Sequence, residues 1–477
     1  MGFSVTRNTA LMTAASIGQK VIALGYFTFL ARSLNNPEDL GAYMAALSIV
    51  AIVVIFIDLG LGNVLVREAA KSKEKIQAYL SSVLGLKVLL AGVVLTGFVL
   101  GVFIFPYRPL LRQFLLVGGV NMLLETVSLT LYGVLRAFGD LRYEAVGIIG
   151  NQFGVAIFGS AVLFWRWPLV FLMAAFTFAS ACQVALAVVV LYRRYGVVVR
   201  PRWSKPWPLF FVKMAIPFAL AAVFFRVYSY IDTVIILHLA GERAVGWYSI
   251  PVKITNAFLF IPLSLGAALY PRMSEYWVTN RAKLGDIFAE SVIYLTLLIL
   301  PVVVGLRVVG RDLVPRLFTS HYLASIPALG LLLFSMFFSF LTYPTGALLN
   351  ASGRQSWHTA VIGAVMVINI ALNFFSIPRY GVVGAALAAL IGNIIFVTAE
   401  WLLINRLISI PYRRVFAVGG KALLSAVVMG AVVWWLRSQA PLGVAMAIGA
   451  VLYPLLLYLF RAVTMDQIKQ RFYQLQN

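Results

Sequence analysis

Charged residues are scarce in this chain. Only 11% of its 477 residues are Asp, Glu, Lys or Arg, whereas 62% are hydrophobic, and the mean hydropathy is +0.94. This composition excludes a soluble globular protein. Apolar runs of about 20 residues recur along the whole chain, which is the length that crosses a bilayer as a helix. They are continuous and longer than the alternating strands of about 10 residues in membrane barrels. The predicted fold class is therefore an all-α polytopic membrane protein.

Residues that build reactive centres are also few. The single cysteine, Cys182, excludes an internal disulfide, and we expect it to be an inert packing residue. Three scattered histidines do not indicate a metal site. No Gly-rich loop followed by Lys and Ser or Thr is visible, which argues against an ATP-driven pump. The sequence therefore predicts no cofactor and no catalytic residue.

Long loops are missing as well. A membrane glycosyltransferase or polymerase would need catalytic side chains on a sizeable outer loop. The nearest approach is the group Arg311, Asp312, Arg316 and His321, which we expect to be a solvated loop. The first apolar run has no small-residue cleavage site, so we expect no signal peptide. These features favour a transporter and not an enzyme.

About 14 membrane spans are predicted. They cover residues 9–32, 40–63, 80–105, 111–135, 143–164, 168–192, 209–239, 246–270, 287–308, 323–349, 356–377, 381–404, 414–436 and 441–460. With the N-terminus in the cytoplasm, the cytoplasmic loops carry about twice as many Lys and Arg as the outer loops, which include Arg108 and Arg243. We therefore predict a multi-pass protein of the cell membrane with both termini cytoplasmic. The net charge of +22 is then mainly an orientation signal and does not indicate a nucleic-acid partner.

The chain contains an internal repeat. One gap-free shift of 205 residues aligns Leu34 with Leu239, Gly41 with Gly246, Tyr43 with Tyr248 and Arg67 with Arg272. A second match pairs LRAFGDLRYEA (135–145) with LNASGRQSWHT (349–359). Six spans per half is an even number, so the halves start on the same side and the repeat is parallel, with a pseudo-twofold axis along the membrane normal.

The repeat predicts the domain organisation. Residues 1–195 form an N-terminal lobe with spans one to six, and residues 209–405 form a C-terminal lobe with spans seven to twelve. Residues 196–208 form a basic cytoplasmic linker, which we interpret as a solvated segment near anionic lipid headgroups. Residues 406–477 hold two further helices, spans 13 and 14, and the C-terminal tail.

Several segments carry a family resemblance. They are LNNPEDLGAYMAALSIV, FIDLGLGNVLVREAA, LNASGRQ and above all INIALNFFSIPRYGVVGAALAALIGN (368–393). The chain resembles the polysaccharide-transporter family, the Wzx-like flippases of the multidrug/oligosaccharidyl-lipid/polysaccharide (MOP) exporter superfamily. The resemblance implies two six-helix lobes, a central cationic cavity, and export of undecaprenyl- or dolichyl-linked sugars by alternating access.

Six basic residues fall inside predicted spans: Lys20, Lys87, Lys213, Arg226, Lys253 and Lys421. Snorkelling to the membrane surface explains Lys213 and Lys421, and it explains Lys87 as well as a functional role does. A charge at mid-membrane depth is costly and usually functional, and Arg matches phosphate oxygens bidentately. We predict that Lys20, Arg226, Lys253 and Lys87 line a cationic cavity that binds an anionic (pyro)phosphate headgroup.

Internal ion pairs are the alternative for these basic residues. The acidic candidates are Asp58, Glu125, Asp232, Glu290 and Glu400. Asp58 and Glu400 lie near cytoplasmic ends, where Arg67 and Arg406 are expected partners. Asp58, Glu125 and Asp232 are also candidates for coupling carboxylates, although the sequence does not identify a coupling H⁺ or Na⁺.

Polar side chains inside the spans could contact sugar hydroxyls. The candidates are Tyr228, Tyr230, Asn121, Asn256, Asn369 and Asn373. Interhelical hydrogen bonds explain them equally well. The predicted function is flipping of polyprenyl-(pyro)phosphate-linked oligosaccharide to the outer leaflet. The expected partners are that substrate, membrane lipids, a glycan polymerase and glycosyltransferases, with the protein itself a monomer. A cation-coupled multidrug exporter of the same superfamily is the alternative; predominantly basic mid-depth charges argue against it.

Overall fold

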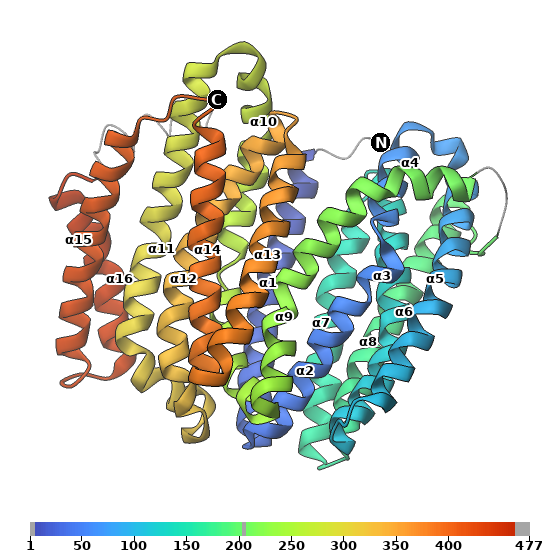
Figure 1. The fold of residues 1–477 in the computed structure, drawn as a ribbon, viewed down its shortest axis with the longest axis horizontal. Coiled ribbons are helices and arrows are strands. Elements are labelled where there is room, and N and C mark those ends of the chain that lie inside the picture. The colour runs from blue at the N-terminus through green and yellow to red at the C-terminus, as the bar shows by residue number, and fades with distance from the viewer. Residues whose placement is uncertain (1–4, 203–206, 463–477) are drawn as a thin grey trace. The chain divides into compact units, whose positions relative to one another are not determined.

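The computed structural model describes residues 5–202 and 207–462, and these residues are almost entirely helical (Figure 1). The α-helices, in chain order, are α1 (Val5–Leu34), α2 (Pro37–Val53), α3 (Ile55–Asp58), α4 (Leu61–Lys71), α5 (Ile76–Ile104), α6 (Pro109–Ala137), α7 (Arg142–Phe164), α8 (Val170–Tyr195), α9 (Trp207–Asn256), α10 (Phe260–Thr279), α11 (Arg281–Phe318), α12 (Ile326–Ala351), α13 (Gln355–Tyr380), α14 (Val382–Ile404), α15 (Tyr412–Leu436) and α16 (Leu442–Leu459). Two short 3₁₀ helices, Lys73–Lys75 and Ser320–Ser325, precede α5 and α12.

The prediction of about 14 spans is confirmed. Among the described residues, 13 helical stretches are long and apolar enough to cross a membrane. One of them, Phe218–Thr279, has 62 residues. At 1.5 Å per residue it would extend about 90 Å, roughly three times the thickness of the hydrocarbon core. It bends at Gly241 (φ 82°, ψ 175°), so it holds more than one span.

Local chemistry explains where the helices begin and end. The Asn36 side chain accepts a hydrogen bond from the Glu38 amide, and Pro37 occupies the first turn of α2. Glu38 and Asp39 add negative charge at this N-terminus, where the helix dipole favours it. At the other type of end, α8 stops at Gly196 with a left-handed φ of 64°.

The second predicted span is broken near its end. After α3, Leu59 (φ 43°) and Gly60 (φ 75°) are both left-handed, and α4 starts in a new direction. A Cβ atom on Gly60 would lie 2.9 Å from the Cβ of Phe218, so the position needs glycine for space as well as for φ. The break leaves Asp58 as the last residue of α3.

The chain forms two compact units. Unit 1 comprises residues 1–249 and 366–382, and unit 2 comprises residues 250–365 and 383–477. One core of unit 1 is built from buried residues of α4, α5, α6, α8 and the start of α9, such as Leu65, Val83, Leu135 and Phe211. One core of unit 2 joins α11, α15 and α16. The units follow packing, whereas the predicted lobes follow the repeat, so the lobe boundaries stay predictions.

The predicted linker is only partly described, because residues 203–206 lie outside the described residues. Its first part is not merely solvated, because Val197 is buried in the core of unit 1. Gln77 of α5 donates to the Val198 carbonyl (2.7 Å) and accepts from the Val198 amide (2.8 Å). The Arg202 amide donates to the Ser81 carbonyl (2.9 Å). The interpretation as a solvated segment is therefore wrong for these residues, which are tied to α5.

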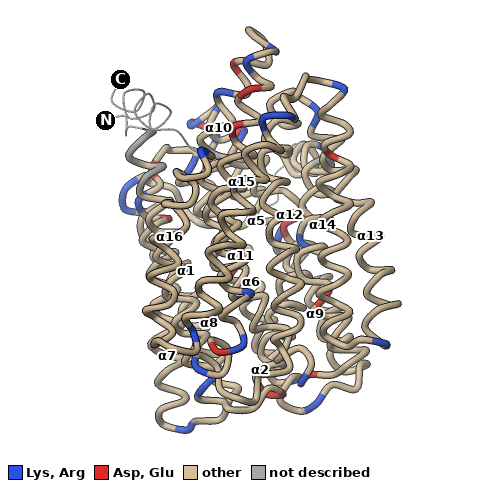
Figure 2. Tube along the Cα trace, turned by 90° about the vertical axis from the view of Figure 1, so that its left-hand side faces the viewer, with Lys and Arg blue, Asp and Glu red and all other residues tan. Residues whose placement is uncertain are grey.

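Charge is distributed unevenly along the helices. Figure 2 shows Lys, Arg, Asp and Glu gathered near helix ends, with few charged positions along the helix middles. The few interior charges therefore need individual explanations.

Cys182, expected as a packing residue, is exposed on the surface of α8, so that prediction is wrong.

Candidate functional site

Arg226, on the first part of α9, is engaged only partly. Its Nη2 donates to Oε1 of Glu125 on α6 at 3.3 Å, and its guanidinium lies 5.8 Å from the ring centroid of Tyr230. About a quarter of the Arg226 side chain (26%) and about a third of the Glu125 side chain (32%) are exposed. A guanidinium has five N–H donors, and the others have no partner among the described residues. Arg226 can therefore still bind an anion bidentately.

Lys20 lies on α1 and is half-buried. Within residues 5–202 and 207–462, no hydrogen bond or ion pair joins its ammonium group to another side chain. The ion-pair alternative is therefore not met for Lys20 by the described residues. A half-buried ammonium group without a carboxylate partner is suited to an anionic ligand.

Lys87, by contrast, is fully occupied. It is 2% exposed, and its Nζ donates to Asp58 Oδ1 (2.5 Å), Thr130 Oγ1 (2.7 Å) and the Thr126 carbonyl (3.2 Å). These contacts use all three donors of the ammonium group. Snorkelling is thus the wrong explanation for Lys87, and the internal ion pair is found instead. The expected pair between Asp58 and Arg67 is wrong. Asp58 pairs with Lys87 instead, because it lies at the break after α3.

Asp232 is a carboxylate held by neutral groups. Its Oδ1 accepts from Asn373 Nδ2 (2.8 Å), and its Oδ2 accepts from the Tyr248 hydroxyl (3.2 Å). Asn373 Nδ2 also contacts the side-chain and backbone oxygens of Asn369. Asn369 and Asn373 are buried, and Asn373 Oδ1 has no hydrogen-bond partner among the described residues. Several oxygen atoms thus converge here, and within the described residues Asp232 is hydrogen-bonded to neutral side chains.

The remaining predicted residues are more dispersed. Tyr228 and Tyr230 lie on the same helix as Arg226, whereas Lys253 and Asn256 belong to unit 2. Asn121 on α6 is 1% exposed, and its Oδ1 has no partner within the described ranges. The structure therefore brings Arg226, Glu125 and Tyr230 together, and separately Asp232, Asn369 and Asn373.

Two acidic candidates of unit 2 have partners that were not predicted. Glu400 was expected near Arg406, but it contacts the Thr345 hydroxyl and His358 Nδ1 and is fully buried. Helix α14 turns this side chain toward α12 and α13 and away from the chain end, so the expectation is wrong. Glu290 pairs with Arg414 at 3.2 Å.

Sequence reasoning missed the neutral partners in these clusters. Thr126 and Thr130, which fix Lys87, and Tyr248, which fixes Asp232, were not predicted as site residues. The i, i+4 spacing of Thr126 and Thr130 on one helix face could have indicated a shared contact. The alignment of Tyr43 with Tyr248 marked the tyrosine but not its partner.

Comparison with known proteins identifies the family. The model described as polysaccharide biosynthesis protein matches residues 5–277, more than half of the chain. The chain belongs to this family. A second model, MatE, matches residues 217–375. The resemblance to the polysaccharide-transporter family is thus confirmed at the level of the family.

Two relatives illustrate the range of similarity to this family member. An uncharacterized membrane protein of Methanocaldococcus jannaschii is 21% identical over 81% of this chain and 83% of its own length. The probable flippase AglR of Haloferax volcanii is 28% identical over 45% of this chain and 46% of its own length.

Solved structures share the fold. The lipid II flippase MurJ, in an inward closed conformation, has a TM-score of 0.78 at 15% identity, over 94% of this chain and 98% of that one. An inward-facing multidrug resistance MATE-family transporter of the MOP superfamily has a TM-score of 0.68 at 14% identity, over 83% of this chain and 98% of that one. At these identities the likeness shows the fold alone.

Proposed function

We propose that this protein flips a polyprenyl-(pyro)phosphate-linked oligosaccharide from the cytoplasmic to the outer leaflet by alternating access. It would act as a monomer in the cell membrane with both termini in the cytoplasm. Glycosyltransferases would supply the substrate and a glycan polymerase would receive it. The observation that carries the proposal is Arg226: a guanidinium inside an apolar helix with one carboxylate contact and unused N–H donors.

Glu125 then acts as a resident counter-ion. Its single 3.3 Å contact with Arg226 neutralises the guanidinium when no headgroup is bound. A (pyro)phosphate offers more oxygen acceptors than one carboxylate and can form a bidentate pair with Arg. The arriving headgroup therefore displaces Glu125, and Glu125 returns when the headgroup leaves. Lys20 supplies a second positive charge, and Tyr228, Tyr230 and Asn121 are candidate sugar contacts.

Lys253, Lys87 and Asn256 have weaker support as ligands. Lys87 would have to break three hydrogen bonds before binding an anion. We retain Lys253 and Asn256 as candidate contacts on the second half of the chain, where substitution of each tests its role.

Asp232 is the proposed coupling carboxylate. The unpartnered Oδ1 of Asn373, the Asp232 carboxylate and the Asn369 side-chain oxygen form an oxygen-rich site that fits a hard cation such as Na⁺, or a proton on the carboxylate. Asp232→Asn should abolish the Na⁺-dependent or pH-dependent part of transport. Thermal unfolding in NaCl against choline chloride distinguishes Na⁺ from H⁺ without a transport assay, with Asp286→Asn, an exposed carboxylate, as control.

The direct test is reconstitution. Purified protein in vesicles is supplied with fluorescent polyprenyl-pyrophosphate-linked oligosaccharide, and outer-leaflet glycan is measured with an impermeant lectin or glycosidase. Wild-type protein should flip the lipid and Arg226→Ala should not. Equal rates in vesicles with and without wild-type protein would refute the proposal.

One observation favours a second candidate, a cation-coupled multidrug exporter. The MatE model matches residues 217–375, which include Asp232. Such an exporter would use this carboxylate to capture an organic cation. Drug-efflux assays in cells separate the two functions, because export of organic cations should depend on Asp232 and not on Arg226.

A further inference from the structure

Helices α2 and α9 touch through a pair of glycines. A Cβ atom added to Gly41 of α2 would lie 1.8 Å from the backbone oxygen of Glu242, and one added to Gly246 would lie 1.9 Å from the backbone oxygen of Pro37. No side chain fits at either distance. The backbones therefore meet directly at the start of α2 and just after the bend of α9 at Gly241.

This contact is reciprocal with respect to the internal repeat. Gly246 is the repeat partner of Gly41, and Glu242 follows Pro37 by the same 205 residues. Gly41 packs against Glu242, and Gly246 packs against Pro37. The two residues of one contact are thus the repeat partners of the two residues of the other. Such mutual contacts are what a twofold axis produces. The contact itself therefore has the local twofold symmetry that the parallel repeat leads us to expect.

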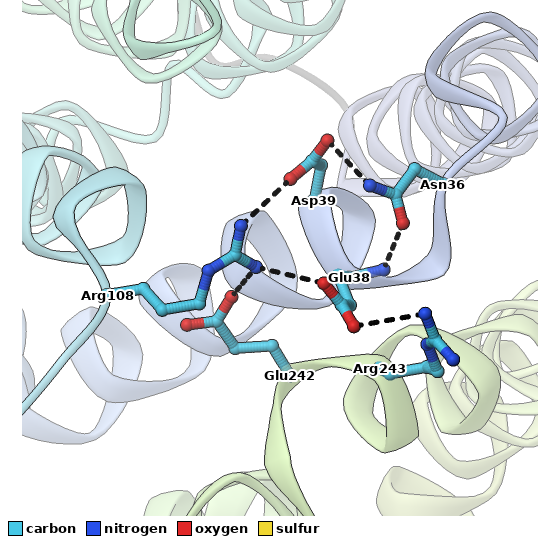
Figure 3. Close-up of polar contacts among 6 residues, drawn as sticks. All are labelled: Asn36, Glu38, Asp39, Arg108, Glu242 and Arg243. Carbon is cyan, nitrogen blue, oxygen red and sulfur yellow. Dashed lines mark hydrogen bonds and ion pairs between the residues drawn. The ribbon is translucent and has the colours of Figure 1, made fainter.

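Ion pairs involve residues that flank the two glycines in sequence, and Figure 3 draws these ion pairs. Arg108, just before α6, places Nη1 2.7 Å from Glu242 Oε2 and 3.5 Å from Glu38 Oε2, and Nη2 3.7 Å from Asp39 Oδ1. Arg243 contacts Glu38 at 3.2 Å. Figure 3 shows the Arg108 guanidinium between carboxylates of α2 and α9, so one side chain bridges both partners of the glycine contact.

Without Arg108 the cluster would repel itself. Three carboxylates would face one guanidinium, that of Arg243, which reaches only Glu38 among them. The Glu242 side chain is 8% exposed and would keep a largely buried charge without the guanidinium of Arg108. Repulsion between Glu242 and the two acidic residues of α2 would then act directly across the glycine contact.

The ion pairs of Arg108 are accessible to water. A cavity of about 430 Å³ lies beside it, lined by Phe105, Tyr107, Arg108, His238 and Glu242 among others. The Arg108 side chain is 47% exposed. Its ion pairs are therefore reversible and sensitive to salt, unlike the buried Lys87 pair.

We propose that Arg108 is a latch that holds the α2–α9 glycine contact closed at the predicted outer end, and that loss of its guanidinium opens the contact. A flippase that works by alternating access must be able to close and reopen its outer end. The role of the latch in transport therefore rests on the proposed function. The latch itself is testable without transport.

The experiment measures cysteine labelling of purified protein by a polar maleimide, with Cys182→Ala as background. The reporter is Ala244→Cys, because Ala244 is 5% exposed and lies between Glu242 and Gly246. Arg108→Ala should speed labelling by up to about fivefold, the population change expected for loss of a half-exposed ion pair. The exchange Arg108→Glu with Glu242→Arg should restore slow labelling.

Two controls separate the latch from general loosening. Arg112→Ala removes an equal charge one turn later on α6, where Arg112 faces the Phe103 ring, and should leave the rate unchanged. Ala240→Cys, at an exposed position of α9, should react equally fast in all variants. If Arg108→Ala labels no faster than Arg112→Ala, the latch is refuted.

A measurement on the otherwise wild-type chain covers the case in which Arg108→Ala does not fold. Raising NaCl from about 0.1 to 1 M shortens the screening length roughly threefold and should speed labelling of Ala244→Cys but not of Ala240→Cys. Labelling independent of salt would overturn the latch. If wild-type protein flips no glycan but the labelling results hold, the proposed substrate fails while the latch stands.

Discussion

Arg226 and Lys87 are both basic residues inside apolar helices, yet their surroundings differ in kind. Lys87 has all three donors satisfied and is buried, so its charge belongs to the packing of α3, α5 and α6. Arg226 shares one hydrogen bond and keeps the rest of its donors free of described partners. The number of hydrogen-bond donors already in use therefore distinguishes Lys87, which stabilises the fold, from Arg226, which can bind a ligand.

Replacing Arg226 tests this assignment. Arg226→Ala should reduce glycan flipping by roughly thirtyfold or more, since a charge-assisted hydrogen bond contributes about 2 kcal/mol. The thermal unfolding midpoint should stay close to that of wild type because the side chain is partly exposed. Lys213→Ala, an exposed lysine on the same helix, is the matched control and should flip normally. Equal flipping by both variants would contradict the assignment.

The Lys87–Asp58 pair calls for a double-mutant cycle. Lys87→Met alone should lower the free energy of unfolding by about 3–5 kcal/mol, because it leaves Asp58 charged without its partner. Lys87→Met with Asp58→Asn should cost clearly less than the sum of the single changes. Thermal or denaturant unfolding in detergent measures both. Additive effects would mean that the two side chains do not interact.

Asp140, in the turn between α6 and α7, predicts a pH effect on stability. Burial alone would raise the pKa of this carboxyl, but hydrogen bonds from Arg142 and Tyr195 outweigh it and the pKa is lowered. A lowered pKa stabilises the folded state above the unfolded value of about 3.9. This stability is lost as the pH falls through the folded pKa.

The matching measurement follows the unfolding midpoint from pH 7 down to about pH 3. Asp140→Asn should lower the midpoint at pH 7 and flatten its decline in acid. Asp286→Asn, at an exposed carboxylate, should follow wild type throughout. Parallel curves for wild type and Asp140→Asn would show that Asp140 does not contribute.

At this scale the sequence located charges inside apolar helices but not the partners of those charges. Hydropathy located Arg226, Asp232 and Lys87, because a charge in an apolar run is visible without a structure. Their partners depend on helix rotation and on the left-handed break at Leu59 and Gly60, which moved Asp58 away from Arg67. Neither is encoded in local composition.

At the scale of helices, the predictions succeeded where an apolar run has clear ends. The spans predicted at residues 80–105 and 111–135 match α5 and α6, which end at Ile104 and begin at Pro109. The spans predicted at residues 414–436 and 441–460 match α15 and α16 equally well. The attachment of Val198 and Arg202 to α5 was missed because backbone hydrogen bonds leave no composition signal.

Glycine substitutions test the contact between α2 and α9. Gly41→Ala should destabilise the protein by more than about 1 kcal/mol, because its methyl group would meet backbone, which cannot rotate away. Gly25→Ala in α1 is the control, since nothing lies within 4 Å of the added atom. Alanine there should stabilise by up to about 1 kcal/mol through helix propensity. Similar midpoints for the two variants would argue against the close contact.

At the scale of the whole molecule, the proposed substrate predicts a response to voltage. Moving a negative charge outward down an inside-negative potential releases about 2.3 kcal/mol per elementary charge for each 100 mV. Glycan flipping in vesicles should therefore speed up when a potassium gradient with valinomycin sets the donor side negative.

A monophosphate-linked glycan is the control for that prediction. It carries less negative charge than the pyrophosphate-linked form and should respond less to the same potential. A rate that ignores the potential for both lipids would indicate that other charges move with the substrate and cancel it, which is the outcome expected if cations are carried outward at Asp232.

The reciprocal glycine contact also has a consequence for biogenesis. Gly41 and Glu242 are far apart in sequence, so the start of α2 enters the membrane long before its partner has been synthesised. Contacts of such long range form late, after the local helices. Glu38 and Asp39 therefore stay hydrated until a countercharge has been synthesised. Arg108 is synthesised before Glu242 and is the first residue of this cluster that can pair with them. We expect the contact between α2 and α9 to stay unformed in the ribosome-bound chain until residue 246 has emerged.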